Sequence, residues 1–195
     1  MAGLADVVAA LSQSNTVKQL GQKLGVDPST VGRGVAAAVP LLTAALANNA
    51  STPTGGQALH QAVTSDHDGS ILDDLKGALQ NADTASGGRI LGHLLGDRQT
   101  AAEQAIARGT GLNAQAASQV LATLAPIVMG AVARLQQEHG LDAQGLSSRL
   151  QQEVEMAKQR APGLMSLATR LLDRNQDGSM LDDVGNMVGK LFKTS

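Results

Sequence analysis

The chain has 195 residues, 43 % of them hydrophobic, and a formal net charge of −2 at pH 7. This length and apolar content suit one globular domain and exclude a disordered chain. The weak net charge excludes a strong field that would attract nucleic acid or an anionic membrane. The absence of Cys excludes disulfides, zinc thiolates and thiol nucleophiles.

The predicted elements are all helical. Phe192 is the one aromatic residue, so the core must be built from Ala, Leu, Val, Ile and Met, which favours closely packed helices. No stretch shows the alternation of a strand. We therefore expect an all-α multi-helix bundle that forms a single domain over residues 1–195. In chain order, helices are predicted near residues 2–12, 16–24, 28–48, 56–63, 71–80, 87–95, 98–108, 113–137, 142–159, 162–172 and 180–192.

Two stretches rich in Asn, Ser, Thr and Gly, residues 48–56 and 81–88, are predicted loops. Pro40 and Pro126 fall inside apolar helical stretches. Each should kink or break its helix, because proline has no N–H to donate.

The sequence predicts no membrane span and no secretory signal. The longest apolar stretches, 35–46 and 120–133, fall short of the ~20 residues that a span needs. The N-terminus has no basic region ahead of its apolar stretch. We expect a soluble protein in the cytoplasm.

The two halves of the chain resemble each other. An offset of 86 residues places Gly25 over Gly111 and Pro40 over Pro126, with apolar positions matching between them. The two Asp-Gly segments match at a larger offset of 109, which predicts a 23-residue helical insertion near 135–162. We expect a duplicated helical unit, with repeat 1 at about 16–80 and repeat 2 at about 98–192. The polar composition of the insertion predicts a solvated helix.

The first candidate site is a helix-turn-helix pattern at residues 19–35. Leu20 and Leu24 would face the core, Gly25 would open the turn, and a recognition helix would follow. The residues that would face DNA are Ser29, Thr30 and Arg33. Few basic residues surround them, and the following stretch is too apolar for a phosphate backbone, so nucleic acid is not the expected partner.

The second candidate is a calcium loop at residues 173–184, "DRNQDGSMLDDV". Oxygen ligands stand at loop positions 1, 3 and 5, and Gly178 at position 6 allows the turn. Position 12 is Val184 instead of a carboxylate, which weakens the match. The candidate ligands are Asp173, Asn175, Asp177, Ser179, Asp182 and Asp183.

A weaker copy of this pattern lies at residues 65–75, where position 1 is Thr64. Its candidate ligands are Asp66, Asp68, Ser70, Asp73 and Asp74. The alternative for both copies is helix capping, with Ser70 and Ser179 as N-caps and the acidic residues in the first helical turn. Capping is the favoured interpretation, and the two are compatible. Calcium is the one cofactor that we consider.

No catalytic residues can be named. The chain has no HExxH, no Gly-rich phosphate loop and no GxSxG, and its four His residues have no partner nucleophile in sequence. We expect a protein that acts by binding a protein partner or a second copy of itself, and not an enzyme. The apolar residues and glycines of "MLDDVGNMVGKLF" (180–192) would allow a helix there to pack closely, also against a partner helix.

Three segments carry a resemblance to a known family: "GRILGHLLGD" (88–97), "LAPIVMGAV" (124–132) and "LLDRNQDGSMLDDVGNMVGKLF" (171–192). Together they resemble the bacterial proteins of domain of unknown function 937, and more distantly the YidB-like proteins. The last segment is the most specific of the three. The resemblance implies an all-helical, soluble bacterial protein with no established activity, and it supplies no catalytic residue.

Overall fold

The computed structural model describes residues 9–11, 14–160, 162–163, 165–166 and 168. Within them lie eight α-helices, two short 3-10 helices and no strand, which confirms the predicted all-α multi-helix bundle. The elements in chain order are α2 (Ser14–Leu24), α3 (Pro28–Ala50), α4 (Pro53–Ser65), η1 (Ser70–Leu72), α5 (Leu75–Gln80), α6 (Thr84–Leu95), η2 (Gly96–Arg98), α7 (Gln99–Thr110), α8 (Ala114–His139) and α9 (Ala143–Arg160). The predicted helix at 180–192 and most of those at 2–12 and 162–172 lie outside the described residues.

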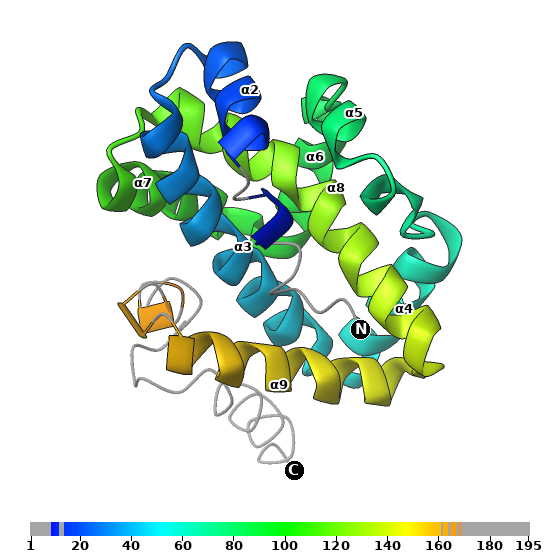
Figure 1. Cartoon of the computed structure of the whole chain (residues 1–195). Helices are drawn as coiled ribbons and strands as arrows, with labels where there is room; N and C mark the ends of the chain where they lie inside the picture. The colour runs from blue at the N-terminus through cyan, green and yellow to red at the C-terminus, as the bar shows by residue number, and fades with distance from the viewer. Residues whose placement is uncertain (1–8, 12–13, 161, 164, 167, 169–195) are drawn as a thin grey trace.

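Helices α3 and α8 form the centre of the bundle, and the other helices pack around them (Figure 1). α3 contacts α2, α4, α6, α7, α8 and α9, while α9 crosses the C-terminal part of α3 and also contacts α4. Most residues of both central helices are buried, and most of the buried ones are Ala, Val or Leu. The small side chains expected from the composition thus supply the core.

By length and composition alone, α3 and α8 could each cross a membrane. Their most apolar windows are 72 % and 83 % buried inside the protein, respectively. Burial of this extent is what the core helices of a soluble protein also show, so these helices are weak evidence for a membrane span. The expected absence of a span stays a prediction.

Both central helices continue through their internal proline. α3 runs unbroken past Pro40 and α8 past Pro126. Neither proline therefore breaks its helix, as one of the two predicted effects would have required. The other predicted effect, a kink at the proline, stays a prediction. In α3 the buried hydroxyl of Thr43 donates to the carbonyl of Val39, 2.9 Å away.

The two halves start their central helices in the same way. Gly25 and Gly111 have φ angles of 65° and 83°, a left-handed conformation that favours glycine. Two residues later, the side chains of Asp27 and Asn113 accept hydrogen bonds from backbone N–H groups in the first turns of α3 and α8. These positions are the ones that the offset of 86 residues pairs. The likeness agrees with a duplication, which stays a prediction.

The predicted loop at residues 48–56 is wrong. α3 extends to Ala50, α4 begins at Pro53, and only two residues separate them. The Thr52 hydroxyl accepts from the N–H of Gly55 at 3.0 Å, and proline stands at the first helical position, where its missing N–H costs nothing. The residues that indicated a loop are capping residues. At 81–88, likewise, only residues 81–83 are non-helical, and Asp83 caps α6.

The polar stretch at 135–162 contains the end of α8 and all of α9. α9 is solvated on only part of its surface, because Leu146, Leu150, Glu153 and Val154 are buried on one face. That face packs on α3 and α4. Whether the stretch is an insertion stays a prediction.

Candidate functional site

The first Asp-Gly segment forms a tight turn between α4 and η1. Oδ1 of Asp68 accepts hydrogen bonds from the backbone N–H and the hydroxyl of Ser70, at 2.9 and 2.6 Å. These bonds hold the pKa of the Asp68 carboxyl below its usual range. Gly69 takes a φ of 80°, as the turn requires.

Helix α8 holds this turn through Arg134. Its Nη2 donates to the carbonyl of Gly69 at 2.9 Å and pairs with Oδ1 of Asp73 at 2.6 Å. Gln137 adds a bond to the carbonyl of Asp68 at 3.2 Å. A guanidinium therefore already supplies positive charge to the carbonyl and carboxylate oxygens of this turn.

The capping interpretation of this segment needs a correction. Ser70 begins the 3-10 helix η1, and it is Asp74 that caps α5 by accepting from the N–H of Gly77 at 2.8 Å. Asp66 ends α4, with its N–H donating to the carbonyl of Ala62. Ser70 fails as the cap because η1 separates it from the start of α5.

Among the described residues, no group of three or more His, Cys, Asp or Glu side chains could hold a metal ion. The four acidic candidates of residues 65–75, Asp66, Asp68, Asp73 and Asp74, therefore do not form such a group. The six stronger candidates, Asp173 to Asp183, lie outside the described residues.

His67 lies within the same turn and is partly buried. Burial lowers the pKa of its imidazole, and the neighbouring carboxylates of Asp66 and Asp68 oppose this effect. The neutral imidazole is therefore the form that the fold favours.

The helix-turn-helix segment has the expected local form: α2, a turn that contains Gly25, and α3. Its three DNA candidates lie at the start of α3, and each has a partner within the chain. The hydroxyl of Ser29 donates to Asp27 at 2.5 Å, which lowers the pKa of that carboxyl. Arg33 donates from Nε to the carbonyl of Thr110 at 3.1 Å and from Nη2 to the hydroxyl of Thr30 at 2.9 Å. Arg33 thus joins the start of α3 to the end of α7.

A groove of about 590 Å³ lies where α9 crosses the C-terminal end of α3, and the sequence reasoning missed it. α3 contributes Ala47 and Asn48, with Ser51 just beyond its end. α9 contributes Ser148, Gln151, Gln152, Val154, Glu155, Met156, Lys158 and Gln159. Most of the surface that the groove exposes is apolar, although its lining includes Gln, Glu and Lys. Such long side chains cover a surface with their methylene groups as well as with their polar ends.

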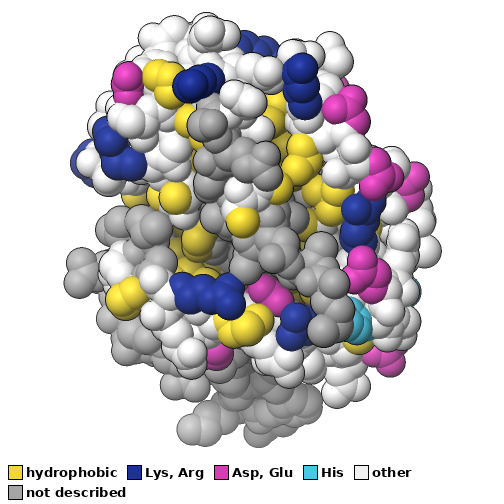
Figure 2. All heavy atoms as spheres, in the orientation of Figure 1, with side chains coloured by type: hydrophobic (Ala, Val, Ile, Leu, Met, Phe, Trp, Pro, Cys, Tyr) yellow, Lys and Arg dark blue, Asp and Glu magenta, His cyan; other side chains and the backbone are white. Residues whose placement is uncertain are grey.

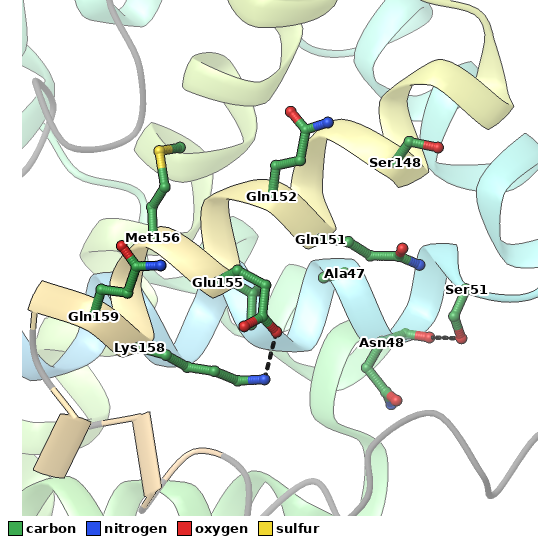
Figure 3. A pocket seen from close by; sticks show the side chains of 11 residues that line it. Ala47, Asn48, Ser51, Ser148, Gln151, Gln152, Glu155, Met156, Lys158 and Gln159 are labelled. Atoms are coloured by element: carbon green, nitrogen blue, oxygen red, sulfur yellow. Dashed lines mark hydrogen bonds and ion pairs between the residues drawn. The ribbon is translucent and has the colours of Figure 1, made fainter.

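Figure 3 shows Gln151, Glu155 and Lys158 extending from α9 on the side of Ala47 and Asn48. Lys158 pairs with Glu155 at 2.6 Å, so the one cation and the one anion of the lining neutralise each other. The lining of the groove therefore carries no net charge. The hydroxyl of Ser147 in α9 donates to the carbonyl of Ala50 at the end of α3, at 2.8 Å, and so joins the two helices.

The wider surface of the protein has separate hydrophobic and acidic regions. On the face in Figure 2, hydrophobic side chains gather near the middle, while acidic side chains line the edge over η1 and α5. One signal in the sequence could have indicated the groove, namely Gln151, Gln152 and Gln159, whose spacing places them near one another on α9. The sequence of α9 does not indicate that α3 forms the other side of the groove.

Comparisons with curated proteins and with solved structures gave no match. A family model described as "bacterial protein of unknown function (DUF937)" matches residues 6–135. The match includes the motifs at 88–97 and 124–132 and excludes the one at 171–192, which had been expected to be the most specific. The more distant likeness to the YidB-like proteins stays a prediction. Because the match spans about two thirds of the chain, the protein belongs to this DUF937 family of bacterial proteins of unknown function.

Proposed function

We propose that the protein acts by binding a helical segment of a protein in the groove between α3 and α9, and not by catalysis. The observation that carries the proposal is the groove itself: an open, mostly apolar surface between two helices, with its one ion pair internally neutralised. Amphipathic helices bind in grooves of this kind by their apolar face. The bound segment belongs to another protein, to a second copy or to the chain itself. The expected location is the cytoplasm.

The test places a photoreactive amino acid at Gln152, inside the groove, and in a matched sample at Gln22, which is exposed on α2. We expect crosslinks at position 152, to another protein, to a second copy or within the chain, that position 22 does not give. A Ser148→Arg substitution should abolish them by filling the groove, and Ser148 is exposed enough to accept the larger side chain. Equal adducts at both positions, or adducts at 152 that survive Ser148→Arg, would contradict the proposal.

Calcium binding by residues 173–183 is the second candidate function. It is carried by the oxygen ligands at loop positions 1, 3 and 5, followed by Gly178. Calorimetry of chelator-treated protein with CaCl₂ tests it, with Asp173→Asn combined with Asp177→Asn as the matched control. Heat that the control does not release supports the site, and no heat in either protein rejects it.

DNA binding through residues 19–35 is less favoured than protein binding. Arg33 already donates to Thr110 and Thr30, and α3 beyond it is largely buried. A gel shift at low salt, compared with Arg33→Ala, would revive this alternative if it showed a salt-sensitive complex that the variant loses.

A further inference from the structure

The described chain ends close to the groove. α9 lines the groove as far as Gln159, and a few residues further along the chain Met165 and Ala168 are buried, each 1 % exposed. Figure 1 shows the described residues 162, 163, 165, 166 and 168 beside the C-terminal end of α9. A further 27 residues, 169–195, follow from this point.

The sequence of residues 180–192 has the pattern of an amphipathic helix. Its seven apolar side chains recur at three- and four-residue spacings, which places them on one helical face. They are Met180, Leu181, Val184, Met187, Val188, Leu191 and Phe192. An apolar face of this size requires a matching surface to cover it.

The lengths of the segment and the groove agree. Thirteen helical residues extend ~20 Å, and the stretch of α9 from Ser148 to Gln159 that lines the groove extends ~17 Å. The connecting residues 169–179 can reach up to ~36 Å when extended. The segment can therefore turn at the Asp-Gly loop and run back along α9 in the antiparallel direction.

The charges also favour the antiparallel direction. Arg160 stands in the last turn of α9, beyond Lys158, which is paired with Glu155, and an antiparallel helix would bring Asp182 and Asp183, in its first turn, beside Arg160. A parallel helix would bring Lys190 and Lys193 there instead. Opposite charges attract across such a contact, and the antiparallel helix dipoles are also favourably aligned.

We propose that residues 180–192 of the same chain occupy the α3–α9 groove as an antiparallel amphipathic helix. The inference rests on the proposed function, because it names the helical segment that the groove binds. The same chain is favoured over a second copy because a connection of 11 residues holds the segment at an effective concentration of about millimolar. A partner helix then has to displace the segment before it can bind.

The experiment uses the full chain, whose lack of Cys makes two introduced cysteines unique. One variant combines Gln152→Cys with Val188→Cys. The matched control combines Gln22→Cys with Val188→Cys, because α2 packs on α3 and α5 and lies at the opposite end of the bundle from α9 (Figure 1). Both are oxidised mildly at low micromolar concentration, and circular dichroism confirms that both are folded.

The proposal expects an intramolecular disulfide in the groove variant, formed at least tenfold faster than in the control. A disulfide-linked dimer in the groove variant would overturn it and assign the segment to a second copy, which leaves the proposed function intact. No disulfide in the groove variant, or equal rates in both variants, would also overturn it. The photoreactive probe at position 152 then decides separately whether the groove binds any other helix.

Discussion

At the scale of single residues, the least expected feature is a charge on the buried face of α9. Glu153 is 5 % exposed, and its partner is Arg149, whose Nη2 lies 2.9 Å from Oε1 in the next helical turn. The Arg149 side chain is itself about one third exposed. Removing one member of a buried ion pair costs more than removing both, because it leaves a charge without compensation.

We therefore expect Arg149→Met to lower the free energy of unfolding by about 2 kcal/mol, reduced from the fully buried case because Arg149 is partly solvated. The double variant Arg149→Met, Glu153→Met should recover most of that loss. Urea denaturation of the two variants and of the unchanged protein measures both effects. A single variant as stable as the double would show that the pair is not coupled.

The stability of the protein should depend on pH through His67. Burial lowers the folded-state pKa of its imidazole below the ordinary value of 6.5. The unfolded chain therefore binds the proton first, and stability falls as the pH drops from 6.5 through the folded pKa. His67→Gln should remove this part of the pH dependence between pH 8 and pH 5, as thermal melts of both proteins would show. An identical pH dependence in the variant would contradict the assignment.

Asp68 should affect the stability of the protein in a different, more acidic pH range than His67. Hydrogen bonds from Ser70 lower its pKa below 3.8, so its contribution is present above that pH and is lost as the pH falls through the folded value. The two residues can thus be distinguished by pH alone.

At the scale of elements, the crossing of α6 over α8 depends on one glycine. A Cβ added at Gly87 would collide with the backbone carbonyl of Ala122, whereas one added at the neighbouring Gly88 would meet nothing within 4 Å. Both glycines lie inside α6, where alanine has the higher helix propensity.

These neighbours should therefore respond with opposite signs. Gly87→Ala should destabilise the protein by about 1–3 kcal/mol, because the helices must separate. Gly88→Ala should stabilise it by up to about 1 kcal/mol, because it removes the helix penalty of glycine without a clash. Chemical denaturation of the two variants measures the difference. Two changes of the same sign would contradict the close crossing.

The positions of the helices were the feature of the structure that the sequence predicted best. Apolar spacing and capping residues such as Asp27 and Asn113 are local signals, and the central helices begin where these signals place them. The loop at 48–56 was wrong because Thr-Pro starts a helix as readily as it ends one. Ser70 was wrong as a cap because a capping box is indistinguishable in sequence from the start of a 3-10 turn.

At the scale of the whole molecule, the sequence could not predict the groove. The groove depends on the contact between α3 and α9, and the bond that fixes it joins Ser147 to Ala50, 97 residues apart. Nothing in the local pattern of either helix specifies that pairing. For the same reason, the polar composition of α9 predicted a solvated helix, although one face of α9 completes the core.

The central claim is that the α3–α9 groove is a binding surface, occupied in the isolated chain. The most direct test is the rate at which maleimide modifies a single cysteine at Gln152, compared with one at Gln22, since both positions are exposed and the chain has no other Cys. We predict that the cysteine at position 152 is modified at least tenfold more slowly than the one at position 22. The rate at position 152 should approach that at position 22 when Val188→Asp and Leu191→Asp disrupt the apolar face of residues 180–192. Equal rates of maleimide modification at positions 152 and 22, in the protein whose residues 180–192 are unchanged, would contradict the account.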